Sequence, residues 1–416
     1  MLGDDSSRRI SRVIFGYAER IVQEQEIGAL LQLNADMARD LVGADRCSIW
    51  LLDTEAGQLY TTVAHGTGEI RVDSGYGLVG ACVSSAQAVV VNETSNDERF
   101  LSGIDATSGY VTRSVLVIPL RSDGGKVIGA LQALNKPDGF SESDITLLGF
   151  AGSYSAAAIE TQKLRKEAET ARILHRELEI AREVQLSLLP QGRPNVEGLD
   201  CAAYFRPARL VGGDYYDFIA FPDGMLAFTL GDVEGKGVPA AVLMASIQAS
   251  LRIRLRDATD SLAALAADLN ESIYALSASR YSTLFCGVID RKCLRLRYIN
   301  AGQSSPVLLR NGQSGVTIER LTIGGTPIGL LPGTVYEEGT VSLQSGDVLV
   351  CFSDGISEAR NSEDEFWPEP EIESVLRAAS SDSIQQLTER LIREVDAFVN
   401  GAEQADDMTL LAIRML

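Results

Sequence analysis

Two short stretches rich in glycine and aspartate constrain the fold of this chain of 416 residues more than any other feature. Residues 211–217 read VGGDYYD and residues 231–237 read GDVEGKG, so each places an aspartate where an apolar segment meets glycines. The turn sequence PDG divides two apolar runs within residues 218–230, which predicts a β-hairpin there. Such a hairpin returns Asp232 towards Asp214. Two adjacent carboxylates repel each other at neutral pH, and a divalent cation is their natural neutralising partner.

The pattern of an aspartate beside an apolar strand occurs twice more. Residues 348–352 run into Asp354, and Asp406 and Asp407 directly precede the apolar residues 408–413. Four aspartate sites at strand ends form an all-oxygen set of hard ligands, which suits Mg²⁺ or Mn²⁺. The alternative is a set of solvated turn aspartates, which is the better explanation of any one site taken alone. Four sites in this order, each flanked by apolar residues, favour a metal centre.

Five motifs in sequence order carry a resemblance to a known family: VGGDYYD, GDVEGKGVPAA, NAGQSSP, FSDGISEA and ADDMTLL. They resemble the metal-dependent PPM-type serine/threonine protein phosphatases, and within them the bacterial SpoIIE/RsbU-like branch, over about residues 180–416. The resemblance implies an α-β-β-α sandwich, whereas the pattern of helices and strands alone gives only an α+β fold.

The same resemblance implies a catalytic centre with two ions, Mn²⁺ or Mg²⁺. Such ions activate a water molecule, so that no protein nucleophile is required. Asp232 would bridge the two ions, and the carbonyl of Val233 would serve as a backbone ligand. The catalytic, metal-binding carboxylates would be Asp214, Asp232, Asp354 and Asp406.

Four further residues near these motifs have an expected role or environment. Asp217 and Asp407 would orient the metal ligands. The chain has Gln303 where the family usually has a histidine, at a position that is not a metal ligand, so the change bears on the shape of that loop. Lys236 stands between two glycines, and it either approaches a phosphate or is a solvated turn lysine.

These motifs predict a protein-serine/threonine phosphatase. The substrates of the SpoIIE/RsbU-like family are phosphorylated STAS-domain anti-sigma-factor antagonists, so the expected pathway is bacterial partner-switching signalling. The alternative is a catalytically silent scaffold, which the presence of all four aspartates disfavours. A nucleotide hydrolase is disfavoured because the chain has no GxxxxGK[ST] motif.

The N-terminal part resembles a GAF domain over residues 25–160, with an antiparallel sheet and helices. Residues 8–42 predict a helix, and residues 142 onwards predict a closing helix capped by Ser141. A GAF domain implies a small-molecule ligand. The expected strands are residues 47–52, 58–64, 88–91, 114–120 and 127–133.

A few residues of this region have the spacing of the NKFDE signature found in GAF domains that bind cyclic nucleotides. They are a candidate ligand site, although the last acidic position of the signature is Ile145. The alternative is that they make a turn and contribute to the core. The candidate residues are Asn135, Lys136, Phe140 and Asp144.

Residues 156–189 contain neither glycine nor proline and predict one long helix. Apolar residues from Leu164 to Val184 recur at spacings of three and four, which resembles a short coiled coil and predicts a homodimer. The alternative is a monomeric helix that lies on the phosphatase core. The predicted organisation is an N-terminal helical extension (1–24), a GAF-like sensor (25–160), a helical linker (161–190) and a phosphatase domain (191–416).

Composition narrows the function further. The formal net charge is −20 and no basic run is present, which argues against a nucleic-acid partner. Six cysteines without a CxxC motif predict reduced thiols and a cytoplasmic protein. No apolar run of membrane-spanning length and no signal peptide are expected. Both histidines, His65 and His175, lie outside the aspartate motifs, which excludes a histidine-based site there.

Overall fold

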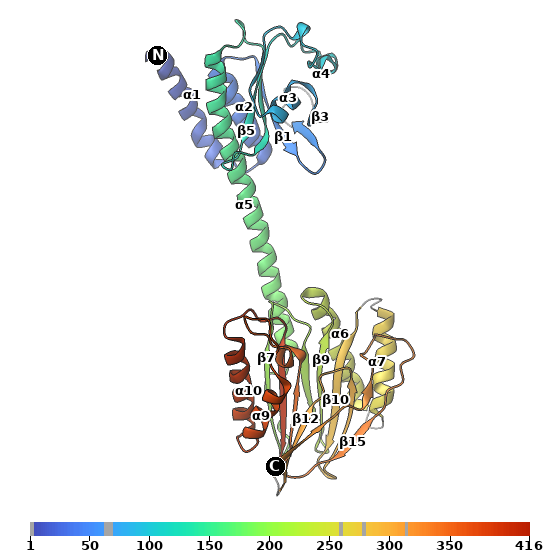
Figure 1. Cartoon of the computed structure of the whole chain (residues 1–416). Coiled ribbons are helices and arrows are strands. Elements are labelled where there is room, and N and C mark those ends of the chain that lie inside the picture. Colours follow the sequence, from blue (N-terminus) through green and yellow to red (C-terminus); the bar gives the residue numbers. More distant parts are fainter. Residues whose placement is uncertain (1–3, 62–69, 258–260, 277–279, 313–314) are drawn as a thin grey trace. The chain divides into compact units, whose positions relative to one another are not determined.

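The computed structural model describes residues 4–61, 70–257, 261–276, 280–312 and 315–416. The chain divides into two compact units, Met1–Arg172 and Ile173–Leu416 (Figure 1). Helix α5 (Glu142–Leu188) is a single helix that contributes its first part to one unit and its last part to the other. Residues 62–64 of the expected strand 58–64, and His65, lie outside the described residues.

The N-terminal unit contains a six-stranded antiparallel sheet with the strand order β3-β2-β1-β6-β5-β4. Successive side chains of β5 point to opposite faces of this sheet, and both faces are covered by helices. Leu116 and Ile118 pack with α2 and α5, whereas Val115 and Val117 pack with α3 on the other face. The strands are β1 (Arg46–Asp53), β2 (Gln58–Thr61), β3 (Ile70–Asp73), β4 (Val89–Val91), β5 (Val115–Arg121) and β6 (Val127–Leu134).

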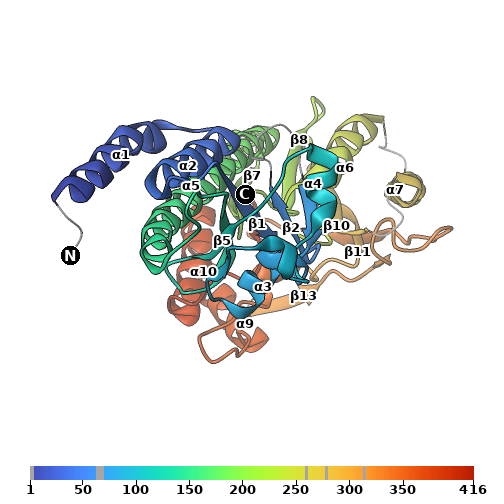
Figure 2. The same ribbon diagram turned by 90° about the horizontal axis from the view of Figure 1, so that it is seen from above.

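The single helix expected over residues 8–42 is wrong, because two helices occupy this stretch. The carboxylate of Glu24 accepts hydrogen bonds from the amides of Gln25 and Glu26, which ends the first helix locally. The two helices lie side by side (Figures 1 and 2). The helices of the unit are α1 (Asp4–Gln23), α2 (Ile27–Val42), α3 (Gly77–Ser85), α4 (Ser102–Ser108) and the 3₁₀ turn η1 (Thr94–Asn96), together with the start of α5.

The C-terminal unit contains two sheets. The first has the order β14-β11-β10-β9-β8, with β15 also paired to β11, and the second has the order β13-β12-β16-β17-β7. The first is built from β8 (Tyr215–Ala220), β9 (Met225–Val233), β10 (Ser282–Asp290), β11 (Arg295–Ala301), β14 (Gly324–Gly325) and β15 (Gly339–Ser342). The second is built from β7 (Leu199–Arg206), β12 (Val307–Gly312), β13 (Gly315–Arg320), β16 (Val348–Phe352) and β17 (Met408–Met415).

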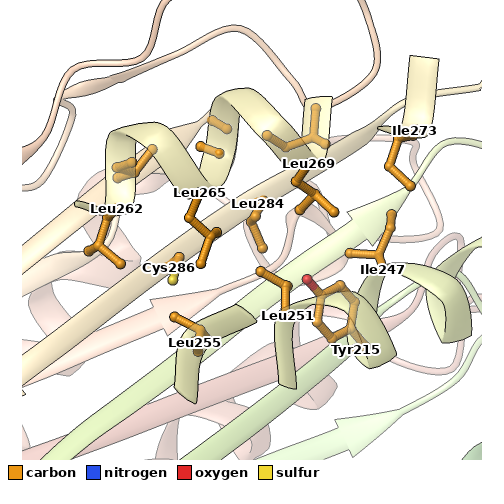
Figure 3. Close-up of a cluster of buried hydrophobic side chains, with 14 of the residues drawn as sticks. Tyr215, Ile247, Leu251, Leu255, Leu262, Leu265, Leu269, Ile273, Leu284 and Cys286 are labelled. Carbon is orange, nitrogen blue, oxygen red and sulfur yellow. The ribbon is translucent and has the colours of Figure 1, made fainter. Parts of the chain in front are cut away.

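Three layers of apolar contacts hold these sheets and their helices together. Phe228 and Phe285 of the first sheet pack against Leu349 and Leu411 of the second. Helices α6 and α7 cover the outer face of the first sheet through a separate cluster (Figure 3), and α9 and α10 cover the outer face of the second. The expected α-β-β-α sandwich is therefore confirmed. The helices are α6 (Val238–Asp257), α7 (Leu262–Leu276), α8 (Asp354–Ser357), α9 (Glu369–Ala378) and α10 (Ile384–Val399).

Helix α6 bears on the expectation that the chain has no apolar run of membrane-spanning length. Among the described residues, the segment Val238–Arg256 is long and apolar enough to meet a length-and-composition criterion for crossing a membrane. Its residues Met244, Ile247 and Leu251 are buried in the cluster shared with α7 and the first sheet. A core helix of a packed domain meets the same criterion, so the segment is weak evidence for a membrane span.

Candidate metal centre and sensor pocket

The predicted hairpin places Asp214 and Asp232 side by side. In the pairing of β8 with β9, Tyr215 lies opposite Gly231. Asp214, which precedes Tyr215, is therefore adjacent to Asp232, which follows Gly231. Glycine is required at position 213, because a Cβ there would lie 2.6 Å from the carbonyl oxygen of Val233 and 3.1 Å from Oδ1 of Asp232. The VGGD loop therefore lies too close to the end of β9 for any side chain at position 213.

A second close approach brings the other two aspartate segments together. Asp354 begins α8 at the end of β16, and a Cβ on Gly355 would lie only 2.0 Å from the carbonyl oxygen of Asp407 and 3.0 Å from that of Asp406. The hydroxyl of Ser353 donates to the Asp407 carbonyl at 3.0 Å. Strands β16 and β17 thus deliver Asp354 and Asp406 to the same end of the second sheet.

Asp407 holds the loop that carries Asp214. Its buried carboxylate accepts hydrogen bonds from the amides of Ala208 at 2.7 Å, Gly213 at 2.8 Å and Asp214 at 3.3 Å. A Cβ on Gly212 would collide with this carboxylate at 1.9 Å. The geometry agrees with the orienting role expected for Asp407.

Asp217 lies elsewhere. Its buried carboxylate accepts two hydrogen bonds from the guanidinium of Arg252, one of them from Nη2 at 2.9 Å. This ion pair joins β8 to α6, so Asp217 fixes a helix to the sheet. Its expected role, orienting the metal ligands directly, has no counterpart in these contacts.

The four predicted metal-binding aspartates interact electrostatically. Burial and the charges of Asp354 and Asp406 raise the pKa of Asp232 to about 8. Burial and then the charge of Asp232 raise the pKa of Asp214 well above its ordinary value, although Thr409 donates a hydrogen bond to it. Burial followed by the charge of Asp406 also raises the pKa of Asp354. Asp232 thus interacts with the other three carboxylates.

The donor set fits a hard divalent cation in its chemistry. All four side chains supply carboxylate oxygen, and their mutual repulsion is relieved when a cation replaces their protons. Within the described ranges, however, no three His, Cys, Asp or Glu side chains already converge as ligands of one ion. Lys236 lies beside this set, with its ammonium 2.9 Å from Oδ2 of Asp406.

Gln303 ties the two sheets together beside this cluster. Its amide oxygen accepts a hydrogen bond from the hydroxyl of Thr283 on β10, and its amide nitrogen lies 3.4 Å from the carbonyl oxygen of Phe352 on β16. Thr283 pairs directly with Asp232 across the first sheet. Gln303 is therefore a buried positioning residue for the loop in which the sequence departs from the family.

The four candidate sensor residues hold the GAF fold together. The amide of Asn135 donates to the Val111 carbonyl at 2.8 Å, and its oxygen accepts from the amide of Arg113 at 2.7 Å. The ammonium of Lys136 pairs at 2.5 Å with Asp144. The other two roles are equally structural: Phe140 is buried in the core, and Asp144 caps the start of α5 through Ser141.

A different set of residues lines a cavity in this unit. The cavity has a volume of about 100 Å³ and lies between the sheet, α3 and α4. None of the four candidate residues lines it. The indole nitrogen of Trp50 donates to Gln132 at 2.9 Å, and the guanidinium of Arg46 stacks 3.9 Å from the ring centre of Tyr110. The aromatic and polar side chains that line the cavity include Arg46, Trp50, Tyr76, Phe100, Tyr110 and Gln132.

Two residues that position the loop carrying Gly212 and Asp214 were not predicted from the sequence. Gln185 on α5 bonds to the backbone of Gly212 through both ends of its amide, and Thr409 donates to Asp214. Thr409 lies inside the motif ADDMTLL, so its position gave a signal. Gln185 lies in the segment that leads into the domain, but nothing in its spacing predicted a partner 27 residues away.

The sandwich and its aspartate cluster define a PPM-type domain, a class of metal-dependent protein serine/threonine phosphatases. Residues 222–416 match the family model described as Stage II sporulation protein E (SpoIIE), and residues 26–159 match that of the GAF domain. The C-terminal region of the chain is therefore similar to the SpoIIE family, and its N-terminal region is similar to GAF domains. Asp232, Asp354 and Asp406 lie inside the matched region, whereas Asp214 precedes it.

Three known proteins are similar to this chain in sequence or in fold. Protein IcfG of Synechocystis sp. is 29% identical over 307 residues, which cover 67% of this chain and 48% of IcfG. The chain thus spans about half the length of that relative. Phosphoserine phosphatase RsbU of Bacillus subtilis is 27% identical over 290 residues, which cover 70% of this chain and 84% of RsbU. The SiaA-PP2C domain of Pseudomonas aeruginosa shares the fold, with a TM-score of 0.53 and 19% identity over 59% of this chain and 99% of that domain.

Proposed function

We propose that this chain is a metal-dependent protein phosphatase acting on phosphoserine or phosphothreonine. The observation that carries the proposal is the gathering of Asp214, Asp232, Asp354 and Asp406 from four separate segments into one electrostatically coupled cluster. A stable fold gains nothing from gathering four mutually repelling carboxylates, of which Asp214 is buried and the other three are partly buried. Their arrangement is explained if they bind cations.

Two divalent ions, Mn²⁺ or Mg²⁺, supply water activation and charge neutralisation when they are bound. Asp232 is the residue suited to bridge them, because it interacts with all three other carboxylates. The Val233 carbonyl, adjacent to Gly213, is the proposed backbone ligand. Asp407 keeps the Asp214 loop in place through three amide hydrogen bonds, so that a ligand need not be reoriented during turnover.

The proposed substrate is a phosphorylated STAS-domain anti-sigma-factor antagonist, and the pathway is partner switching in the cytoplasm. The support is the similarity to RsbU, which is named a phosphoserine phosphatase, over most of that protein's length. An acidic chain without a basic surface run suits a protein substrate rather than a nucleic acid.

The N-terminal domain is proposed to bind a small molecule and to regulate the phosphatase. The cavity beside Trp50 and Tyr110 supports this role better than Asn135 and its neighbours do, because the cavity is lined by aromatic rings and polar groups. A homodimer is proposed to form through α5, on which Leu164, Leu174 and Val184 are exposed. Exposed apolar residues at this spacing are buried when two such helices pair.

The test is release of phosphate from a phosphoserine peptide by the full chain, with and without Mn²⁺ or Mg²⁺. We expect turnover that a chelator abolishes and that either metal restores. Turnover that persists in the chelator would refute the metal mechanism. A chain that binds the metal but releases no phosphate from any phosphoprotein would instead be the catalytically silent scaffold.

A further inference from the structure

The floor of the cavity in the GAF unit is polar, because alternate residues of β1 point into it. Arg46, Ser48 and Trp50 line the cavity, whereas the residues between them pack with α2 on the other face of the sheet. Gln132 of β6 lies directly opposite Ser48 and lines the same cavity. The sheet thus presents a guanidinium, a hydroxyl and an amide to one small space.

Two of these polar groups have donors that no described residue accepts. Ser48 is only 7% exposed, and its hydroxyl makes no hydrogen bond with any residue that the structure describes. The side-chain oxygen of Gln132 accepts a hydrogen bond from the indole of Trp50 at 2.9 Å, and the NH₂ group of the same amide has no partner within the described ranges. Buried polar groups are nearly always satisfied, so a ligand that carries acceptor atoms suits this floor.

The N-terminus of α3 adds two backbone donors. Leu78 and Val79 line the cavity, and their amides precede the first hydrogen bond of the helix, which runs from Gly80 to Tyr76 at 3.1 Å. No side chain caps this end, and the first turn has no acidic residue. Amides at the N-terminus of a helix favour an anionic oxygen. The helix end and the Ser48 hydroxyl therefore point to the same kind of ligand atom.

The charged side chains around the cavity also favour an anion. The guanidinium of Arg46 lies 3.9 Å from the centre of the Tyr110 ring, and both residues line the cavity. Asp105 lines it too, but the amide and the hydroxyl of Thr112 donate to its two carboxylate oxygens at 2.7 and 2.8 Å. A ligand carboxylate matches this setting, because its two oxygens fit the planar donors of a guanidinium.

We propose that this cavity binds a small aromatic carboxylate, a single ring that bears one carboxylate group. The proposal rests on the small-molecule role proposed above for the N-terminal domain and specifies the class of ligand. The ring packs among Trp50, Tyr76 and Phe100, whereas the carboxylate faces the donors of the sheet and of α3.

The size of the cavity separates this class from larger ligands. Its volume of about 100 Å³ suits one ring, since a cavity of about 150 Å³ in another protein holds a single benzene molecule. A cyclic nucleotide carries a fused base, a sugar and a phosphate, and it exceeds this volume. The cavity therefore selects against the ligand that the spacing of Asn135, Lys136, Phe140 and Asp144 suggests.

Calorimetric titration of benzoate into the full-length chain tests the ligand class. The comparison ligands are benzyl alcohol, which has the ring without the charge, acetate, which has the charge without the ring, and cyclic GMP. We expect saturable binding of benzoate, binding of benzyl alcohol and acetate that is at least about tenfold weaker, and no binding of cyclic GMP. Acetate or benzyl alcohol binding as tightly as benzoate would overturn the proposal.

Tryptophan fluorescence tests the place of binding, because the chain has only two tryptophans. Trp50 lines the cavity, whereas Trp367 is buried in the other unit. In Trp367→Phe, which leaves Trp50 as the single reporter, benzoate should change the emission with the same midpoint as the calorimetric curve. In Trp50→Phe the remaining emission should not respond. An unresponsive Trp50 at saturating benzoate would place the ligand outside this cavity and overturn the proposal.

Two variants test the donors. Ser48→Ala should weaken benzoate severalfold, and Arg46→Gln should weaken it about tenfold or more while leaving benzyl alcohol nearly unchanged. A merely structural role of Arg46 would weaken both ligands alike. The matched control is Arg113→Ala, since Arg113 is an exposed arginine of the same unit that does not line the cavity. It should bind benzoate like the wild type.

The outcomes separate this proposal from the function on which it rests. Benzoate affinity unchanged in both Ser48→Ala and Arg46→Gln would overturn the aromatic carboxylate site. Binding of cyclic GMP at Trp50 without binding of benzoate would overturn the ligand class and leave the small-molecule role of the domain standing. None of these measurements requires turnover, so a chain that binds benzoate but hydrolyses no phosphopeptide would contradict the phosphatase function alone.

Discussion

Gln185 and Gly212 form a two-point amide contact at the entrance to the metal loop. The side-chain nitrogen of Gln185 donates to the carbonyl of Gly212 at 2.7 Å, and the amide of Gly212 donates back to the side-chain oxygen at 3.1 Å. Gln185 is buried and lies near the C-terminal end of α5, and Gly212 lies two residues before Asp214. The helix that leaves the GAF domain is therefore bonded directly to the backbone that positions a proposed metal ligand.

Replacement of Gln185 by leucine should destabilise the phosphatase domain. The buried amide and carbonyl of Gly212 lose their partners, and leaving such groups unsatisfied costs about 1–3 kcal/mol each. Urea unfolding of the full chain measures the loss. Glu177→Leu, at an exposed position of the same helix, is the control and should change the unfolding free energy little. Equal stability of the two variants would mean that the Gln185 contact does not hold the loop.

Replacement of Gln303 by histidine should keep phosphatase activity within roughly tenfold, on the order of 1.4 kcal/mol in the barrier. An imidazole retains one donor and one acceptor for Phe352 and Thr283, the two partners of the glutamine amide. Gln303→Leu retains neither, so it should lose more activity than the histidine variant. Complete inactivity of Gln303→His would assign this position a direct chemical role.

The ion pair of Asp144 with Lys136 should make the N-terminal domain sensitive to acid. Burial alone would raise the pKa of Asp144, but hydrogen bonds from Lys136 and Ser141 outweigh burial and lower the pKa. A lowered folded pKa stabilises the fold at every pH above the ordinary carboxyl value near 3.9, and this contribution is lost as the pH falls through the folded pKa.

Asp144→Asn should therefore lower the unfolding free energy by about 1–2 kcal/mol at neutral pH. The difference from the wild type should shrink as the pH is lowered to about 3. Urea unfolding at a series of pH values provides the measurement, and Asp138→Asn, at an exposed position of the preceding turn, is the control. A difference that stays constant across this range would show that the charge of Asp144 contributes nothing.

Disruption of the exposed apolar row on α5 should separate the proposed homodimer. Leu174→Glu combined with Leu178→Glu places like charges where two helices would pair, and repulsion replaces apolar burial. Light scattering at micromolar concentration should give a dimer for the wild type and a monomer for the variant. Arg176→Glu changes the net charge by the same two units outside the row and should remain dimeric. A monomeric wild type would rule out pairing through α5.

The sequence predicted that the aspartate segments lie close together, because the constraints that place them are local. The PDG turn determines the register of β8 and β9, and that register alone brings Asp214 next to Asp232. The glycines at 213 and 355 mark close approaches whose partners, Val233 and Asp407, lie in the quoted motifs. Local turn chemistry and strand alternation thus determined most of this site.

The features that the sequence did not predict depend on distant contacts. Lys136 and Asp144 have the spacing of a ligand signature, but their side chains face each other. The cavity lies elsewhere and is formed by residues from six separate stretches of the chain. The break between α1 and α2 arises from a carboxylate that bonds to the next two amides, which an apolar periodicity does not reveal. The partner of Asp217 is likewise an arginine 35 residues away.

The central claim is that Asp232 and its three neighbours form a centre for divalent cations. Calorimetric titration of Mn²⁺ into the metal-free full chain tests it most directly, with Asp232→Asn as the variant, because that change removes the shared carboxylate charge while keeping its size. We expect the wild type to bind two ions per chain and Asp232→Asn to lose most of this binding while keeping its fold by circular dichroism. Equal Mn²⁺ binding by the two proteins, or none by the wild type, would contradict the account.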